Sequence, residues 1–155
     1  MSEKGDRAYE LFLQGYNCSQ AVFGTFCEEL GIDFETAVRL SSGFGGGIGR
    51  MREVCGTLLG AIMAADMVYG YSDPKDVSSK KELYEKIRAL AAQFRADNGS
   101  IICRELLGLE RAEESAAPSE RTPEYYRKRP CPMLCRYSAE LFERFMAEDP
   151  KKEKG

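Results

Sequence analysis

The sequence contains no histidine, and this absence excludes several kinds of site. Histidine is the most frequent general base, the usual nitrogen ligand of zinc and the last residue of the C-x-x-C-H haem attachment motif. A haem attached through that motif is therefore excluded. Any chemistry must use sulfur, carboxylates, amines, the backbone or a bound cofactor.

A strong net charge and a long hydrophobic run are also missing. The net charge is −3 and the isoelectric point is about 5.2, which suggests neither nucleic acid nor an anionic membrane as a partner. The most apolar segment, residues 54–68, contains Thr57 and Asp66 and is shorter than the roughly 18–20 residues of a membrane helix. The polar start MSEKGDRAYE lacks a signal-peptide core, so we expect a cytoplasmic protein without membrane insertion.

The sequence has six cysteines but no C-x-x-C pair. In a reducing cytoplasm, cysteines are metal ligands, redox groups or core residues more often than permanent disulfides. The missing C-x-x-C pair weighs against a thioredoxin-like exchange mechanism. A site built from these thiols would have to be assembled by tertiary packing.

Hydrophobic periodicity predicts an all-α fold, a single domain over residues 1–155. Residues 53–68 are apolar nearly all round, which predicts a central helix. Residues 110–129 are polar and interrupted by prolines, and we interpret them as a surface excursion. Residues 148–155 are predicted to be a frayed tail. We expect about five main helices, at residues 18–30, 33–40, 53–68, 76–97 and 132–147. A short helix is expected at residues 101–107, and a further short amphipathic helix at residues 6–14.

A glycine-rich stretch, GFGGGIG, precedes the predicted central helix and holds five glycines in seven positions. It fits neither the dinucleotide-binding pattern G-x-G-x-x-G nor the P-loop pattern, and no strand precedes it. We interpret it as an irregular connection in which glycine permits positive φ. Beside Cys55 it would also leave space and N–H donors around a sulfur or a cluster. The candidate cofactor-binding residues are therefore Gly45, Gly46, Gly47 and Arg50.

Four cysteines fall at the predicted starts of helices. Cys18 follows Asn17, a good N-cap residue, and Cys131 lies between two prolines and is the expected N-cap of the last helix. A helix N-terminus carries about half a positive charge and unpaired N–H groups, and it stabilises a thiolate relative to a thiol. We therefore predict lowered thiol pKa values. The catalytic and metal-ligating candidates are Cys18, Cys55, Cys103 and Cys131.

The other two cysteines are placed differently. Cys27 lies nine residues after Cys18, on the opposite face of the same predicted helix, and we assign it to core packing. Cys135 lies one helical turn after Cys131, where Cβ atoms are about 5–6 Å apart and a disulfide needs roughly 3.5–4.5 Å. This pair should not close, but both sulfurs could face one metal ion or one partner cysteine.

Four stretches together resemble one known family: GYNCSQAV, SGFGGGIGRMREVCGTLLGAIM, GSIICRELLG and RPCPMLCRYSAELFE. They are similar to the redox-active protein family C_GCAxxG_C_C, named after its cysteine pattern, over about residues 6–146. The resemblance implies an all-helical redox protein associated with transport or electron transfer, and with iron–sulfur ligation in some relatives. One departure is Thr57, which stands where the C-G-A-x-x-G element usually has alanine. The family's recurrent cysteines fall on Cys18, Cys55, Cys103 and Cys131.

Three functions remain open from the sequence. The first is a redox or electron-transfer protein whose four cysteines converge, as ligands of an iron–sulfur cluster or as exchanging thiols. The second is a structural zinc site with four cysteine ligands, or a helical interaction domain without redox activity. The third is a small-molecule or anion site with Arg50 and Arg52 as counter-charges. The sequence identifies no redox partner and does not decide whether the protein is an oxidoreductase-type enzyme. A homo-oligomer is also compatible with the sequence.

Overall fold

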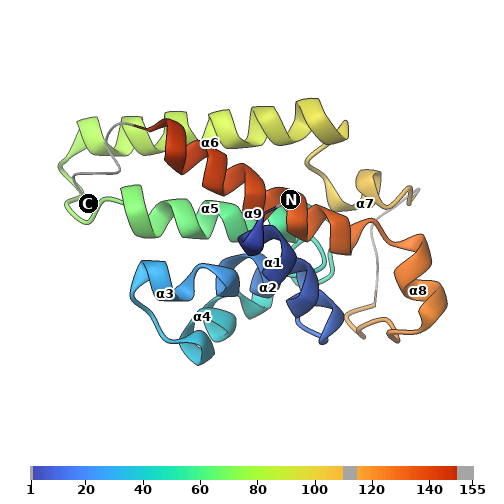
Figure 1. Ribbon diagram of the computed structural model, residues 1–155. Coiled ribbons are helices and arrows are strands. Elements are labelled where there is room, and N and C mark those ends of the chain that lie inside the picture. The colour runs from blue at the N-terminus through green and yellow to red at the C-terminus, as the bar shows by residue number, and fades with distance from the viewer. Residues whose placement is uncertain (1, 110–114, 150–155) are drawn as a thin grey trace.

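The computed structural model describes residues 2–109 and 115–149 of the chain (Figure 1). This part holds nine α-helices and one 3-10 turn, and no strand occurs in it. Its one isolated β-bridge joins Val54 and Ile102. The predicted all-α class is confirmed. The helices are α1 (Glu3–Leu13), α2 (Cys18–Thr25), α3 (Cys27–Leu30), α4 (Phe34–Ser41), α5 (Gly56–Tyr69), α6 (Val77–Asn98), α7 (Cys103–Leu106), α8 (Pro123–Lys128) and α9 (Cys131–Glu148), with the 3-10 turn at Ser42–Phe44.

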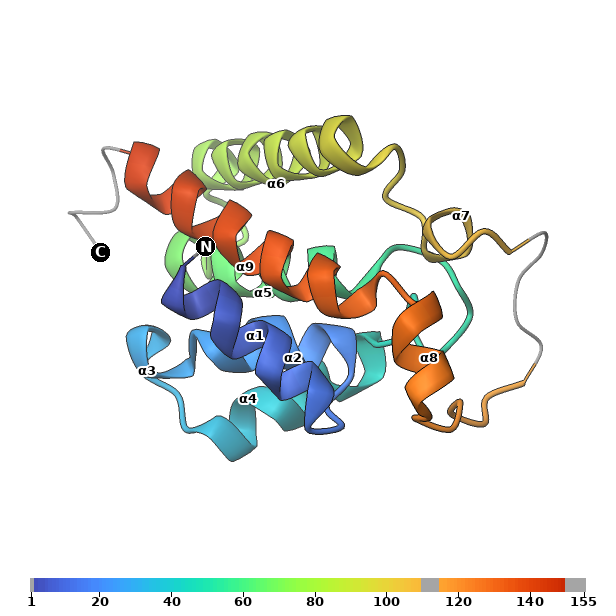
Figure 2. The same cartoon turned by 45° about the vertical axis from the view of Figure 1, so that its right-hand side comes forward.

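Helix α5 forms the centre of the bundle, as its apolar sequence predicted. It packs against α2 on one side and against α9 and α6 on the other, while α1 packs on both α9 and α2 (Figures 1 and 2). Ala61, Ala64 and Ala65 of α5 are fully buried. Their small side chains let the neighbouring helices approach the central helix closely.

Gly60 sets the closest approach of α5 to α2. A Cβ atom at this position would lie 2.9 Å from the Ser19 carbonyl oxygen and 2.9 Å from the Val22 Cβ atom. Real Cβ atoms do not approach other atoms so closely, so glycine is required by the packing itself. This crossing brings the start of α2 next to the start of α5, which is where the cysteines of both helices lie.

The predicted helix over residues 18–30 is wrong as a continuous element, because the chain breaks at Phe26 into α2 and α3. The Thr25 hydroxyl donates a hydrogen bond to the Ala21 carbonyl oxygen at 2.8 Å, a bond that bends helices. Phe26 leaves helical geometry and packs edge-on against Phe142 of α9, with ring centroids 4.8 Å apart. Packing of one aromatic side chain therefore overrides the local helical pattern.

Two helices begin later than predicted, α5 at Gly56 and α7 at Cys103. The residues before them are extended because they pair with each other: Val54 and Ile102 form the isolated bridge, and the Cys55 N–H donates to the Ile101 carbonyl at 2.8 Å. A periodicity analysis of one segment cannot detect such pairing between distant segments. The pairing also ties the start of α5 to the start of α7.

The predicted surface excursion at 110–129 contains a short helix in its described part. Thr122 caps α8 by accepting a hydrogen bond from the Tyr125 N–H, and Pro123 occupies the first turn. Residues 110–114, which open the predicted excursion, lie outside the described residues.

The tail prediction at 148–155 is likewise tested only in part. Glu148 still belongs to α9, and Asp149 forms an ion pair with Lys86 of α6 at 2.8 Å, so these two residues are not frayed. Residues 150–155 lie outside the described part. Among the helices of residues 2–109 and 115–149, none has the length and apolar character needed to cross a membrane.

Candidate functional site

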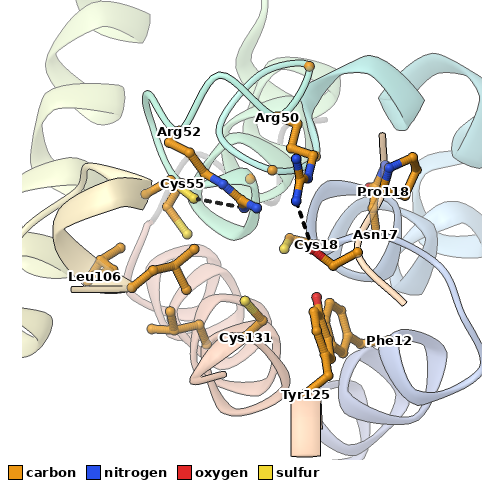
Figure 3. A pocket seen from close by; sticks show the side chains of 18 of the residues that line it. Phe12, Asn17, Cys18, Arg50, Arg52, Cys55, Leu106, Pro118, Tyr125 and Cys131 are labelled. Atoms are coloured by element: carbon orange, nitrogen blue, oxygen red, sulfur yellow. Dashed lines mark hydrogen bonds between the residues drawn. The ribbon is translucent and has the colours of Figure 1, made fainter. Parts of the chain in front are cut away.

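The starts of four helices meet at one end of the bundle, around a cavity of about 400 Å³ (Figure 3). Cys18 is the first residue of α2, and Cys103 is the first residue of α7. Cys55 is the N-cap of α5, and Cys131 is the first residue of α9, one position inside the predicted cap. All four side chains line the cavity. The prediction that they lie at helix starts is confirmed, and tertiary packing brings the four together.

The glycine stretch forms part of the cavity wall, with an unusual backbone. Five consecutive residues, 46–50, have φ between +55° and +71°, and Arg52 follows at +61°. The left-handed region costs a residue other than glycine roughly 1–2 kcal/mol. Glycine at three of these positions limits the strain, as predicted, but Ile48, Arg50 and Arg52 adopt the same conformation. The loop is therefore held by its surroundings and not by local preference alone.

This loop places its backbone against two of the cysteines. The Gly46 N–H donates a hydrogen bond to the Cys18 sulfur. Gly47 lies behind the wall, where a Cβ atom would be only 2.7 Å from the Cys103 Cβ atom. Of the predicted cofactor-binding residues, Gly45, Gly46 and Arg50 line the cavity and Gly47 supports it from behind. Their binding of a cofactor stays a prediction.

The thiols of Cys18 and Cys131 lie within hydrogen-bonding reach of each other. This hydrogen bond, together with burial, raises the pKa of Cys18 well above its usual value. Cys18 therefore keeps its proton and donates it to the Cys131 sulfur. Cys18 is half-buried and Cys131 is buried, so the pair lies at the boundary between the cavity and the protein interior.

Cys55 lies deeper in the protein than Cys18, and its thiol contacts one of two hydrogen-bonded hydroxyl groups. Its sulfur is 3.2 Å from the Thr57 hydroxyl oxygen, and the Ser138 hydroxyl of α9 donates to the same Thr57 oxygen at 2.9 Å. Burial raises the pKa of Cys55 to about 12, although the Thr57 hydroxyl acts in the opposite direction. Cys55 is therefore a neutral thiol near neutral pH.

Cys103 faces an arginine. The buried Arg52 guanidinium donates a hydrogen bond to the Cys103 sulfur across 3.8 Å. Burial raises the pKa of Cys103, and this contact with Arg52 opposes the rise. Arg52 was predicted as a counter-charge for an anion, and in the structure it contacts the thiol of Cys103.

The predicted lowering of the thiol pKa values is wrong for three of the four cysteines. The hydrogen bond with Cys131 and burial raise the pKa of Cys18, and burial raises the pKa of Cys55 and of Cys103. Removal from water disfavours the charged form, and here it outweighs the positive helix ends and arginines. The prediction used only the position of each cysteine along its own helix, whereas the burial of a thiol depends on the other elements that pack around that thiol.

Cys135 is a fifth thiol at this site. It is fully buried on α9, one turn after Cys131, and its thiol donates to the Cys18 carbonyl oxygen at 4.0 Å. Burial and the nearby Cys18 and Cys55 thiols raise its pKa well above the usual value. Spacing had indicated that Cys131 and Cys135 share a face, but not that this face meets Cys18. Cys27 belongs to the hydrophobic core, as assigned.

Arg121 is a functional candidate that the sequence analysis missed. It lines the cavity and donates hydrogen bonds to the carbonyl oxygens of Phe12, at 2.8 Å, and Tyr16, at 3.1 Å. Its guanidinium lies 4.1 Å from the centre of the Phe12 ring. It sits within the stretch interpreted as a surface excursion, where no local pattern distinguishes it from solvent-exposed charges.

The cysteines do not form a ready metal site in this arrangement. All six are free thiols, and within the described residues no group of three or more cysteine, aspartate or glutamate side chains is placed to hold a metal ion. Four of the thiols carry raised pKa values in this arrangement, so binding of a metal ion would have to displace their protons. Ligation of an iron–sulfur cluster or zinc by the four cysteines stays a prediction, and we derive no chemistry through either.

Comparison with known proteins adds the family. A family model described as "Putative redox-active protein (C_GCAxxG_C_C)" matches residues 16–145. The chain belongs to this family. The match covers all six cysteines and the glycine stretch, and it makes the protein a cysteine-containing member of a redox-active family. No curated protein and no solved structure matches the chain.

Proposed function

We propose that the protein is a thiol–disulfide redox protein whose working pair is Cys18 and Cys131. The observation that supports this pairing is the proximity of the two thiols, which lie within hydrogen-bonding reach and border the same cavity where the start of α2 meets the start of α9. In the proposed reaction both thiols lose a proton, together they lose two electrons to a disulfide-bearing oxidant, and one sulfur–sulfur bond forms. Cys131, which accepts the hydrogen bond, attacks first, and Cys18 resolves the mixed disulfide.

The other three thiols at this site have other partners, which supports this choice of pair. Cys55 contacts the Thr57 hydroxyl, Cys103 contacts the Arg52 guanidinium, and Cys135 donates to a backbone carbonyl. Closing the working pair requires a shift of the two helix starts. Terminal turns open more easily than helix interiors, so the first residues of α2 and α9 are suited to this movement.

The test is to oxidise the reduced protein mildly and to map its disulfides by peptide mass spectrometry. We expect a bond between Cys18 and Cys131, with loss of two titratable thiols. Cys18→Ser and Cys131→Ser should each prevent it, whereas Cys27→Ser serves as the control and should leave it intact. A disulfide confined to other cysteines, or none, contradicts the proposal.

Metal analysis addresses the alternatives. Protein purified without oxygen is assayed for iron, acid-labile sulfide and zinc, and its visible spectrum is recorded. Iron with sulfide and charge-transfer bands would support cluster ligation by the four cysteines, and stoichiometric zinc would support a structural site. Either result contradicts the thiol proposal. A colourless, metal-free protein with a full set of titratable thiols supports it.

A further inference from the structure

Cys135 is a buried thiol that the proposed reaction does not use. It lies on α9 one turn after Cys131 and is fully buried, whereas Cys18 and Cys131 border the cavity (Figure 3). Its sulfur lies 4.0 Å from the carbonyl oxygen of Cys18, to which its thiol donates. The working pair therefore has a third thiol beside it, and an oxidant that enters the cavity meets Cys18 or Cys131 before it meets Cys135.

The geometry of α9 decides which partner Cys135 can take. Residues four apart on a helix have Cβ atoms about 5–6 Å apart, and a disulfide needs roughly 3.5–4.5 Å, so Cys131 and Cys135 cannot bond while α9 stays helical. Cys18 belongs to a different helix and approaches both: its thiol reaches the Cys131 sulfur, and its carbonyl oxygen accepts from Cys135. Cys18 is thus the shared neighbour of the two α9 thiols.

The other two thiols at the cavity are held by different groups. Cys55 contacts a threonine hydroxyl, and Cys103 contacts an arginine guanidinium. The hydrogen-bond acceptor of Cys135, in contrast, belongs to Cys18 itself. Burial raises the pKa of Cys135 well above its usual value, and the Cys18 thiol is the second cause of that rise. Cys135 is therefore a protonated thiol close to Cys18 near neutral pH.

The residue that has to move is Cys18. It is the first residue of α2 and is only half-buried, whereas Cys135 lies in the second turn of α9 and is fully buried. Terminal turns open at a lower free energy than the interior of a packed helix. The same opening of the first turn of α2 that closes the bond to Cys131 also gives Cys18 access to Cys135.

We propose that Cys135 is a third redox-active residue, which takes over the disulfide from Cys131 by internal exchange. The inference rests on the proposed function, which supplies the Cys18–Cys131 bond. The Cys135 thiol loses its proton and attacks the Cys18 sulfur, the bond between Cys18 and Cys131 breaks, and Cys131 leaves as a thiolate that takes up a proton. One disulfide replaces another, so no electrons are gained or lost and no further oxidant is needed. The oxidised protein then regains a free Cys131 thiol at the cavity.

The experiment follows the position of the disulfide over time. Reduced full-length protein is oxidised briefly with hydroxyethyl disulfide, the oxidant is removed by desalting, and samples are quenched in acid at intervals. No lysine or arginine separates Cys131 from Cys135, so trypsin leaves both in one peptide. Free thiols are therefore blocked with one reagent, and disulfide-bonded cysteines are reduced and labelled with a second. Fragmentation of the peptide then shows which of the two cysteines carried the bond.

We expect the Cys18–Cys131 bond first and the Cys18–Cys135 bond later, while the intact mass shows one internal disulfide throughout. The later bond should reach about a tenth or more of the oxidised pool at equilibrium, because exchange conserves the numbers of thiols and disulfides. In Cys135→Ala the first bond should form and persist. The control variant Cys27→Ser should behave as wild type.

A second variant tests the contact without the working pair. In Cys131→Ser the oxidant reacts with Cys18, and Cys135 is the thiol that resolves the mixed disulfide, so the Cys18–Cys135 bond should form directly. If Cys135→Ala does not fold, this variant and the wild-type time course decide the question.

The outcomes separate this inference from the proposed function. A stable Cys18–Cys131 bond, with no Cys18–Cys135 bond in wild type or in Cys131→Ser, overturns the role of Cys135 alone. Transfer of the disulfide to Cys55 instead of Cys135 has the same meaning. A Cys18–Cys135 bond that forms without any Cys18–Cys131 bond before it overturns the proposed working pair and the exchange with it. Failure of both bonds to form overturns the proposed function itself.

Discussion

The Thr57 hydroxyl oxygen lies 3.2 Å from the Cys55 sulfur and receives a hydrogen bond from the Ser138 hydroxyl. Because the Ser138 proton points to the Thr57 oxygen, the Thr57 proton is available to Cys55. All three side chains are buried. A chain of polar groups thus runs from α9 to the cap of α5. Thr57 is also the position at which this sequence departs from the alanine of the family element.

Thr57→Val should lower the free energy of unfolding by about 1–3 kcal/mol, because it leaves the buried Ser138 hydroxyl without its acceptor. It should also raise the pKa of Cys55 further, since the hydroxyl favours the thiolate. Urea unfolding under reducing conditions measures the first effect. In the control, the double variant Thr57→Val with Ser138→Ala should recover part of the loss, because both polar partners are then gone. Unchanged stability in Thr57→Val contradicts the assignment.

Gly47→Ala should destabilise the protein more than Gly49→Ala. Both positions have left-handed φ values, +71° and +55°, so both substitutions carry the backbone cost of roughly 1–2 kcal/mol. Only at Gly47 would the new Cβ atom collide, at 2.6 Å from the Glu53 nitrogen and 2.7 Å from the Cys103 Cβ atom. Overpacking adds about 1–3 kcal/mol there. Thermal or urea unfolding of the two variants compares them, and equal stabilities would show that the loop does not press on Cys103.

Gly60→Ala tests the contact between α5 and α2. Alanine favours a helix over glycine by about 1 kcal/mol, so a surface position would be stabilised. At Gly60 the added methyl group meets the Ser19 carbonyl and Val22, and we expect a net loss of about 1–3 kcal/mol. Gly43→Ala is the control, since nothing lies within 4 Å of its Cβ position. A stabilised Gly60→Ala variant would show that the helices have room to separate.

The stability of the reduced protein should fall at alkaline pH. Burial raises the pKa of Cys55 from its ordinary value of 9.0 to about 12, so the folded state retains a proton that the unfolded chain has lost. The contribution is complete below pH 9 and disappears as the pH rises through about 12. One such group changes the unfolding free energy by at most about 1.4 kcal/mol per pH unit.

Urea unfolding at a series of pH values measures this slope. Cys55→Ser should make it shallower by up to that amount, while Cys27→Ser serves as the control variant. Tyrosines with raised pKa values contribute equally to wild type and variant, so they cancel in the comparison. Identical slopes for wild type and Cys55→Ser would contradict the deep burial of the Cys55 thiol.

Local sequence patterns predicted much of the fold. Gly31 and Gly99 end α3 and α6 in left-handed geometry, and Asn17 and Asp33 cap α2 and α4, as their residue types indicate. Where the prediction was wrong, distant contacts were responsible. Phe26 breaks a helix because it packs on Phe142, and such a contact leaves no trace in the periodicity of one segment.

The sequence by itself determined that the protein is helical and that Cys18, Cys55, Cys103 and Cys131 stand at helix starts, because periodicity and capping act within a few residues. Only the tertiary structure decided that the Cys18 thiol meets Cys131, that Cys135 joins them, and that burial keeps the Cys55 thiol neutral. These properties depend on which surfaces α2, α5 and α9 bury against one another. Desolvation and contact are set by the whole assembly of helices, and no single stretch of the chain encodes them.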